Sequence, residues 1–240
     1  MSCELLSHLE ANGYCVIDRY LAASVLQSLI AGFDDPNDSK DSARLSAGVR
    51  EKRGVRFARR NLLSSALVRD FIASEPVRSL IECIDPTAVA VRAILFDKTG
   101  DANWAVPWHQ DRSIAVETKI ETPGFGPWSN KAGVVHVQPP IGVLEKMFTL
   151  RFSLDACGAD NGPLRIIAAT HTGILNTAEI EHAVQNRTES IGAMQAGGVL
   201  IMRPLILHAS SPAKFVGHRR ILHIEFGPPT LPGELRWAMV

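Results

Sequence analysis

The change of pattern near residue 86 constrains the fold of this chain more than any other feature of its sequence. Before that point the sequence contains long amphipathic stretches, whereas from residue 88 onward it consists of short apolar runs separated by Gly, Pro, Asn and Asp. Short runs of that kind are typical of strands in an all-β barrel or sandwich. We therefore predict a mainly β (α+β) fold, a double-stranded β-helix or jelly-roll barrel over residues 87–228, flanked by N-terminal helices.

Residues 1–86 are predicted to form a mostly helical N-terminal part. The hydrophobic spacing and the glycine stop at Gly13 indicate where its elements begin and end. The expected elements are a helix over 3–12, a strand over 14–20, a helix over 22–33, a loop over 34–46 and a long helix over 62–84.

The length and composition favour an ordinary globular protein. At 240 residues the chain could be one or two domains, but no linker-like stretch interrupts residues 88–226, so we predict a single domain over 1–240. Its hydrophobic content of 46% is enough for a sizeable core. The formal net charge is zero, so nothing global attracts the chain to nucleic acid or to an acidic membrane. We expect the partner to be a small-molecule substrate.

The cysteines and the N-terminus indicate a reducing compartment. Cys3, Cys15, Cys83 and Cys157 are scattered with no Cys-x-x-Cys pair, so we interpret them as reduced and mostly buried thiols. The first residues are acidic where a signal peptide would be basic, and no apolar stretch approaches membrane-spanning length. A cytoplasmic location is therefore expected, whereas the sequence does not indicate an oligomeric state.

The segment Trp108-His109-Gln110-Asp111 is the first candidate for metal chemistry. It follows a β-branched and apolar run over 88–99 and a short Gly-Asp-Ala-Asn turn. In an extended segment the side chains of His109 and Asp111 point to the same side, because the side-chain period of a strand is two residues. Both can therefore reach one ion, although a His-x-Asp pattern is common enough to carry little weight alone.

A second histidine, His208, ends an apolar run that starts at a glycine turn and pauses at Pro204. That position lies at the rim of a strand and aims the imidazole toward whatever the sheet encloses. A lone histidine on an apolar strand is more often a core residue than a ligand. Two imidazoles and one carboxylate can, however, occupy one face of an octahedral metal and leave its other sites open. His109, Asp111 and His208 together match the ligand set of a non-haem Fe(II) oxygenase.

The run from His218 to Phe226 predicts a strand whose two sides differ. The polar side carries Arg219, Ile221, His223 and Glu225, and the apolar side carries Arg220, Leu222, Ile224 and Phe226. We expect Arg219 rather than Arg220 to point into the barrel, where a guanidinium fork could hold a dicarboxylate co-substrate such as 2-oxoglutarate. The alternative is that both arginines are solvated charges that protect a strand edge.

Several segments resemble the phytanoyl-CoA dioxygenase-like branch of the Fe(II)/2-oxoglutarate-dependent oxygenases. They are ILFDKT, NWAVPWHQD, LRFSLDACGADNGPLRII, GGVLIMRPLILHASS and HRRILHIEF, and together they cover most of residues 88–226. The resemblance implies the jelly-roll fold, Fe(II) and 2-oxoglutarate as cofactors, and the oxidation of a small organic molecule by dioxygen with release of succinate and CO2.

The resemblance also implies roles for individual residues. His109, Asp111 and His208 match the iron-binding triad, and Arg219 matches the residue that holds the distal carboxylate of 2-oxoglutarate. Two weaker matches place Ser210 beside that carboxylate and Arg151 near the co-substrate. One departure stands out, because the family often has Pro-Gly-Ser-His where this chain has Ala-Ala-Thr-His at residues 168–171.

Three other classes of protein remain as alternatives. A cupin-type metal-binding barrel, either an isomerase or a sensor, would share the triad but would need no keto acid, and Arg219 with Ser210 would have no use there. A zinc hydrolase would favour a motif such as His-Glu-x-x-His, which the sequence lacks. A non-catalytic interaction module is disfavoured because the triad is complete.

The sequence does not identify the substrate. The basic residues within 50–60 could meet the phosphates of a coenzyme A tail or a carrier protein, although a solvated face is the simpler interpretation. The Gly- and Pro-rich loop 121–131 is either a lid over the site or a surface loop with its aromatics packed beneath it. Candidate residues for an apolar wall are Trp104, Trp108, Phe125 and Trp128, and candidates for an anion contact are Lys98, Arg112 and Lys131.

Overall fold

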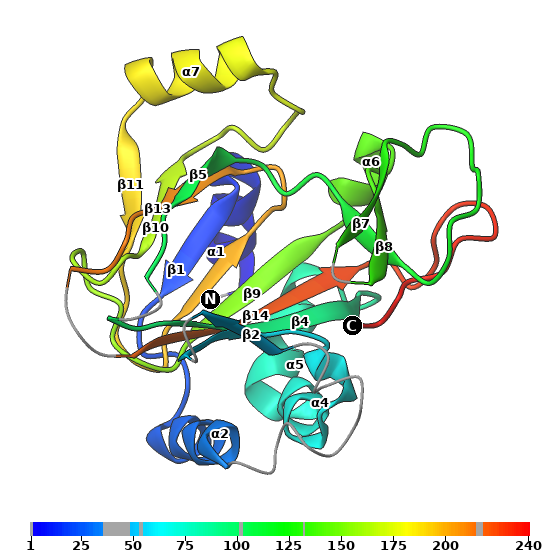
Figure 1. Ribbon diagram of the computed structural model, residues 1–240. Coiled ribbons are helices and arrows are strands. Elements are labelled where there is room, and N and C mark those ends of the chain that lie inside the picture. The colour runs from blue at the N-terminus through cyan, green and yellow to red at the C-terminus, as the bar shows by residue number, and fades with distance from the viewer. Residues whose placement is uncertain (1, 36–48, 53–54, 101–102, 132, 215–217) are drawn as a thin grey trace.

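Two antiparallel sheets face each other in the computed structural model, and helices cover the outer side of the larger one (Figure 1). The structure describes residues 2–35, 49–52, 55–100, 103–131, 133–214 and 218–240.

The larger sheet has seven strands in the order β1-β12-β9-β14-β4-β3-β2. Their bounds are β1 Tyr14–Ile17, β2 Val49–Lys52, β3 Val55–Arg59, β4 Val89–Lys98, β9 Phe148–Ser153, β12 Val199–Met202 and β14 Arg219–Gly227. Each described strand pair in this sheet is antiparallel. Strand β14 is the fourth of the seven, so its hydrogen bonds are made on both edges.

The facing sheet has four strands in the order β11-β10-β13-β5, and a third sheet of three strands in the order β6-β8-β7 lies beside them. The bounds of the four strands are β5 Val106–His109, β10 Leu164–Ile167, β11 Glu189–Gly192 and β13 Leu207–Ser210. Those of the three strands are β6 Ile114–Val116, β7 Trp128–Lys131 and β8 Val134–Val137.

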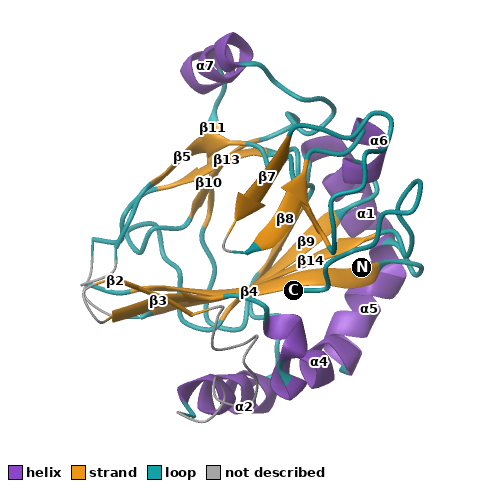
Figure 2. Ribbon diagram, turned by 45° about the vertical axis from the view of Figure 1, so that its right-hand side comes forward, coloured by secondary structure: helices purple, strands orange, loops and turns teal. Residues whose placement is uncertain are grey.

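The N-terminal helices lie against the outer face of the large sheet (Figure 2). They are α1 Ser2–Asn12, α2 Ala23–Asp34, the short 3-10 helix η1 Leu62–Ser64, α4 Ala66–Ala73 and α5 Glu75–Ile84. Two further helices are α6 Ile141–Leu144 and α7 Thr177–Asn186. Helix α6 packs near the three-stranded sheet, and α7 packs on the four-stranded sheet. The main hydrophobic core therefore sits between the large sheet and its helices.

Strand β14 shows how the sequence divides the two faces of the large sheet. Leu222, Ile224 and Phe226 are fully buried in the core with the helices. Arg219 and His223, on the opposite face, line a cavity between the two sheets. The two-residue period predicted from the sequence is therefore the observed one, and the inward arginine is Arg219.

The predicted long helix over 62–84 is wrong, because the structure breaks this stretch into η1, α4 and α5. Ser65 and Ser74 both have extended backbone angles and stand as N-caps of the helices that follow them. Pro76 lies in the first turn of α5, where its missing N–H costs nothing, and in the middle of one long helix it would have removed a hydrogen bond. Of the loop expected over 34–46, residues 36–48 lie outside the described part of the chain.

The predicted fold class is confirmed by the two facing antiparallel sheets. Within the described residues these sheets are hydrogen-bonded separately and do not close into one continuous barrel. The N-terminal part supplies helices and also three strands of the large sheet, β1, β2 and β3.

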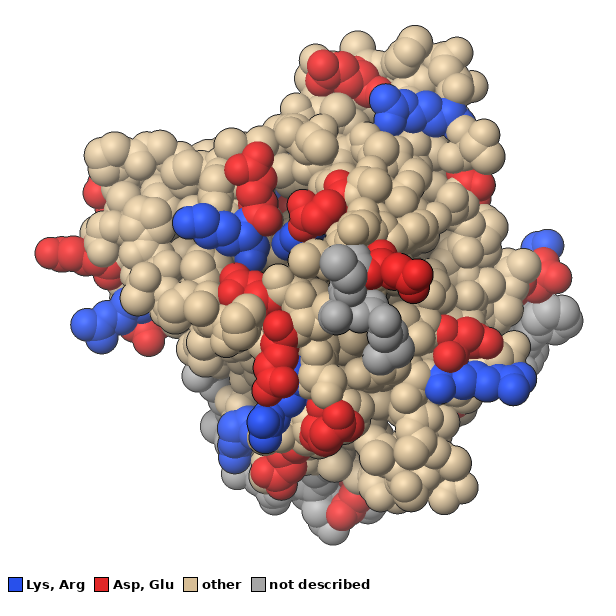
Figure 3. Space-filling model, turned by 180° about the vertical axis from the view of Figure 1, so that it is seen from behind, with Lys and Arg blue, Asp and Glu red and all other residues tan. Residues whose placement is uncertain are grey.

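No helix among the described residues combines the length and the apolar character needed to span a bilayer. On the face of the molecule seen in Figure 3, acidic and basic side chains lie intermixed.

The turn after β10, where the sequence departs from the pattern of the family that it resembles, connects two strands and the N-terminal helix. Ala169, where the family often has Gly, has a φ of 56°, in the left-handed region that disfavours a β-carbon. Its backbone N–H donates to the carbonyl of Asn12 at 2.9 Å. The next residue, Thr170, donates from its hydroxyl to Ile167 and accepts from the N–H of Leu207. The turn thus ties β10 to the start of β13, which carries His208.

Replacing Ala169 with Gly should stabilise the protein by about 0.5–1 kcal/mol, because Gly adopts this φ without steric cost and that gain exceeds the added entropy of the unfolded chain. The free energy of unfolding, measured with a chemical denaturant, tests this. The matched control is Ala168→Gly, which only increases the entropy of the unfolded chain and should destabilise. Equal losses in both variants would contradict the strain at Ala169.

Candidate active site

A cavity of about 360 Å³ lies between the two sheets. It receives side chains from β4, β9 and β14 on one side and from β5, β10 and β13 on the other. The residues that line it are Arg60, Arg92, Ile94, Phe96, Lys98, Trp104, Val106, His109, Asp111, Lys131, Arg151, Leu164, His208, Ser210, Arg219, His223 and Glu225. All six residues singled out from the sequence as metal or co-substrate ligands are in this set.

His109, Asp111 and His208 meet at one point of the cavity wall. Strand pairing sets His109 on β5 directly opposite His208 on β13. Asp111 follows β5, and its carboxylate oxygens lie 3.7 Å from Nε2 of His109 and 3.8 Å from Nε2 of His208. One ligand atom from each of the three residues lies within 4.8 Å of the others. Such a cluster of two imidazoles and one carboxylate can hold a single metal ion.

Hydrogen bonds turn both imidazoles toward that point. Nδ1 of His109 lies 2.8 Å from the carbonyl of Pro107, and Nδ1 of His208 lies 2.9 Å from the carbonyl of Ile206. A carbonyl can only accept, so each Nδ1 carries the proton and each Nε2 offers its lone pair. Burial lowers the pKa of His208 to about 4, which keeps this ring neutral at physiological pH. The donor set therefore fits a bound divalent metal.

Gln110 fixes the loop between the two ligands of the motif. This buried amide donates from Nε2 to the carbonyls of Leu205 at 2.6 Å and Gly173 at 2.8 Å, and its Oε1 accepts from the N–H of Leu175 at 2.9 Å. The backbone N–H of Asp111 also donates to a carbonyl, that of Pro204, at 2.9 Å. Gln110 was not among the candidates from the sequence, because nothing in a sequence distinguishes an amide that bonds to distant backbone from one on the surface.

One end of the cavity holds two buried cations. Lys98 and Arg219 face each other across β4 and β14 and are only 1% and 3% exposed. Lys98 Nζ donates to Ser210 Oγ at 3.1 Å and to the carbonyl of Ser211 at 2.8 Å, and both acceptors are neutral. Arg219 Nε is buried without a hydrogen-bond partner in the described part of the chain. Burial, reinforced by the charge of Arg219, lowers the pKa of Lys98 to about 7.

A chain of polar contacts crosses the floor of the cavity. Arg151 Nη1 lies 2.6 Å from Nδ1 of His223, Nε2 of His223 lies 3.2 Å from Glu225, and Arg92 donates to the same carboxylate at 3.0 Å. Burial alone would raise the pKa of Glu225, but the charge of Arg92 and the hydrogen bond from His223 outweigh it and lower that pKa to about 2. Glu225 is thus a fixed negative charge. Arg92 was not among the sequence candidates, although its even spacing from Lys98 along the strand was a usable signal.

Only some of the residues suggested for substrate contact reach the cavity. Trp104, Lys98 and Lys131 line it. Arg112 instead donates to the carbonyl of Leu175. The remaining three aromatic residues pack in hydrophobic clusters outside the cavity lining: Trp108, Phe125 and Trp128. Phe125 and Trp128 of loop 121–131 belong to one hydrophobic cluster, and the lid role of this loop stays a prediction.

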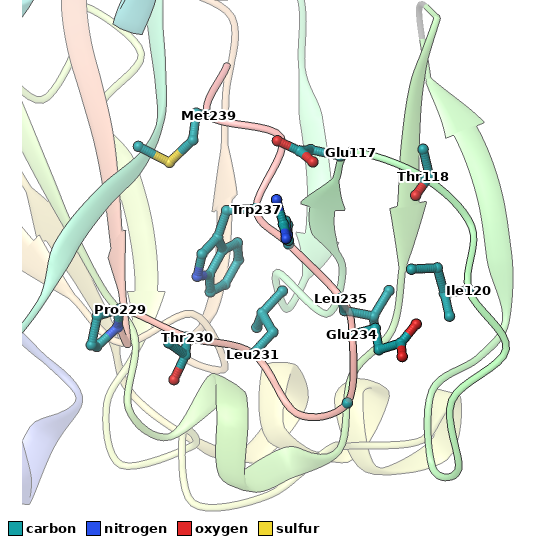
Figure 4. A pocket seen from close by; sticks show the side chains of 12 residues that line it. Glu117, Thr118, Ile120, Pro229, Thr230, Leu231, Glu234, Leu235, Trp237 and Met239 are labelled. Carbon is teal, nitrogen blue, oxygen red and sulfur yellow. The ribbon is translucent and has the colours of Figure 1, made fainter.

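A second hollow, of about 810 Å³, lies along the C-terminal segment (Figure 4). Pro229, Leu231, Trp237 and Met239 border it together with Glu117 of the strand-to-loop connection after β6. Although it is larger, it contains none of the triad residues and no pair of buried cations. The smaller cavity between the sheets is therefore the candidate active site.

A jelly roll that encloses a His-Asp-His cluster and a cationic end is the arrangement of a non-haem iron oxygenase that uses a 2-oxo acid. The family model of phytanoyl-CoA dioxygenase (PhyH) matches residues 9–221, and the chain belongs to this family. The resemblance stated from the sequence is confirmed, and with it the class of 2-oxoglutarate-dependent oxygenases. Comparison with curated proteins gives no significant match.

Solved structures of low sequence identity share the fold. AviO1 from Streptomyces viridochromogenes superposes with a TM-score of 0.68 at 20% identity, over 97% of each chain. EctD from S. alaskensis, with 2-oxoglutarate and 5-hydroxyectoine, gives 0.73 at 14% identity over 95% of this chain and 76% of its own. HygX from Streptomyces hygroscopicus, with nickel and 2-oxoglutarate bound, gives 0.62 at 13% identity over 94% and 86%.

Replacing Gln110 with Ala should weaken metal binding by about 10- to 100-fold, as is usual when a group that orients a ligand is removed. Calorimetric titration of the apoprotein with Fe(II) under nitrogen measures the dissociation constant. His208→Ala, which removes a ligand, should abolish stoichiometric binding, and Gln185→Ala on the exposed side of α7 is the matched control. Wild-type affinity in the Gln110 variant would show that the loop holds Asp111 without the amide.

Proposed function

We propose that this protein is an Fe(II)- and 2-oxoglutarate-dependent dioxygenase that hydroxylates a small organic molecule. One oxygen atom of O2 would enter the substrate and the other would enter succinate, while the carboxyl carbon of 2-oxoglutarate leaves as CO2. Family membership and neighbours solved with 2-oxoglutarate support the class. The hydroxylation itself and a cytoplasmic location remain predictions.

The observation that carries the proposal is the pair of buried cations at one end of the cavity. Lys98 and Arg219 lie side by side, the two acceptors of Lys98 are neutral, and burying charge without a paired counter-charge is costly. A carboxylate between them would remove that cost and would satisfy Arg219 Nε. The distal carboxylate of 2-oxoglutarate is such a group, with Ser210 as a neutral hydrogen-bonding neighbour. A cupin-type isomerase or sensor would have no use for this pair.

The triad would hold the iron through Nε2 of His109, Nε2 of His208 and the carboxylate of Asp111. When bound, the metal supplies the activation of dioxygen that side chains cannot provide. The residues of this chain orient the reactants. Phe96, Trp104 and Leu164 give the cavity an apolar wall that excludes water. Arg151 lies on the cavity floor, where we propose that its charge meets the co-substrate.

The test is turnover of iron-loaded protein with 2-oxoglutarate and a metabolite library under labelled dioxygen. Succinate formation and a substrate mass gain of one labelled oxygen are expected. Substrate turnover that needs no 2-oxoglutarate would return the protein to the cupin-type class. A chlorinated product in chloride buffer would exclude hydroxylation, although Asp111 should occupy the site that a halide needs.

Replacing Arg219 with Lys should weaken 2-oxoglutarate binding by about 1.5–3 kcal/mol, because an ammonium cannot reproduce the two parallel bonds of the guanidinium. Anaerobic titration of the Fe(II) protein with 2-oxoglutarate measures this. The matched control is Arg220→Lys, whose side chain pairs with Asp155 and Asp34 away from the cavity. If the Arg220 variant loses 2-oxoglutarate affinity instead, the residue that holds the carboxylate lies on the opposite face of β14 from the one predicted.

Binding of 2-oxoglutarate should weaken as the pH rises above about 7. Burial holds the pKa of Lys98 to about 7 in the free protein, and a bound carboxylate favours the charged form and raises that pKa. Above pH 7 binding therefore requires uptake of a proton, so the affinity falls by up to about tenfold per pH unit, whereas below pH 7 it is constant. Dissociation constants from pH 6 to 9 test this. A Lys98→Met variant should lose the pH dependence, and an unchanged profile in that variant would contradict the assignment.

A further inference from the structure

The cavity has a second cationic end, away from Lys98 and Arg219. Alternate residues of β4, from Arg92 through Ile94 and Phe96 to Lys98, all line it. Lys98 lies six positions after Arg92 along the strand, which corresponds to about 20 Å. A site for one end of 2-oxoglutarate at Lys98 therefore leaves the Arg92 end for another ligand.

Arg60 and Lys131 line the cavity together with Arg92. Arg60 follows β3, Arg92 lies on β4 and Lys131 ends β7, so three separate segments bring these side chains together. The same three residues also line a small recess that adjoins the cavity and that includes Arg50 and His136. We call Arg60, Arg92 and Lys131 the basic cluster.

The basic cluster carries more positive charge than its partners neutralise. The carboxylate of Glu225 pairs with Arg92 at 3.0 Å. Lys131 Nζ donates to the neutral hydroxyl of Ser113 at 2.8 Å, and Arg60 Nε is buried with no hydrogen-bond partner in the described ranges. Burial and the nearby charge of Arg92 lower the pKa of both Arg60 and Lys131. Arg60 and Arg92 are half-buried beside the exposed Lys131, so their like charges repel one another until an anion binds among them.

The triad lies within electrostatic reach of the basic cluster. Along β14, Arg219 pairs with Lys98, His223 pairs with Arg151 on β9, and Glu225 pairs with Arg92. The charge of Asp111 acts on both Arg151 and Lys131. A molecule bound at the basic cluster would therefore reach toward the triad from the side opposite the Lys98 end.

We propose that the basic cluster binds an anionic group, a carboxylate or a phosphate, of the molecule that the enzyme oxidises. This inference rests on the proposed function. The cavity of about 360 Å³ is at the small end for a ligand site and must also hold 2-oxoglutarate, so the reacting part of the substrate is small. Its anionic group anchors it, and the carbon to be oxidised lies a few bonds away, toward the triad.

The first test is anaerobic calorimetry on the Fe(II) protein with saturating 2-oxoglutarate, so that the Lys98 end is filled. Inorganic phosphate and acetate are titrated separately at constant ionic strength. Wild-type protein should bind at least one of them, and Arg60→Gln and Lys131→Gln should each weaken it about tenfold or more, the loss typical of a charge-assisted hydrogen bond. The matched control is Arg78→Gln, an exposed arginine of α5 that should leave the affinity unchanged. Absence of binding, or equal binding in all four proteins, would overturn the proposal.

The second test uses matched substrate candidates and follows succinate formation above the level without substrate. Small carboxylic acids are compared with their carboxamides, and phosphomonoesters with the corresponding alcohols. The charged member of a pair should stimulate the wild type and the Arg78 variant but not the Arg60 variant, and the stimulating class identifies the anion. Stimulation by neutral members alone would overturn this inference and leave the proposed function standing. Failure of the protein to bind iron and 2-oxoglutarate, measured by anaerobic titration with each of them, would overturn the proposed function instead.

Discussion

The alternation of side chains along β14 is the constraint on which the rest of the molecule depends. This strand lies in the middle of the seven-stranded sheet, so both of its edges are paired and both of its faces are buried. One face contributes Leu222, Ile224 and Phe226 to the core under the helices. The other presents Arg219 and His223 to the cavity. A register shift of one residue would place charges in the core and leucine in the site, so the core itself specifies the orientation of the polar residues.

Much of the site could be predicted because its residues obey local rules. His109 and Arg219 were assigned from the two-residue period of strands, and the structure has them on the cavity wall. The role of Gln110 was not predicted, because its partners are backbone groups about 60 to 95 residues away. The break between helices α4 and α5 at Ser74 was not predicted either, because the apolar spacing continues across it although the backbone of Ser74 is extended. Sequence patterns report which face a residue occupies, and they do not report which distant loop it touches.

The cavity differs from an ordinary core in its balance of charge. Glu225 is paired with the charge of Arg92 and lies within hydrogen-bond distance of His223, whereas among the described residues Lys98 and Arg219 share no carboxylate between them. An interior with surplus positive charge at both ends is costly for an isolated protein and favourable once anions enter. The ligand-free protein is therefore less stable than the protein with bound anions, and ligand binding should raise the free energy of unfolding.

The hydrogen bonds of His223, which lies between the two cationic ends of the cavity, have a fixed donor-to-acceptor direction. An arginine can only donate, so Nδ1 of His223 accepts from Arg151, and Nε2 of His223 must carry the proton that Glu225 accepts. Neutral His223 thus links the positive Arg151 to the negative Glu225 without adding charge. Removing Arg92 would leave Glu225 buried without its paired cation, and the loss would combine folding with binding. Arg60, which pairs with no carboxylate among the described residues, separates the two effects and is the informative position in the basic cluster.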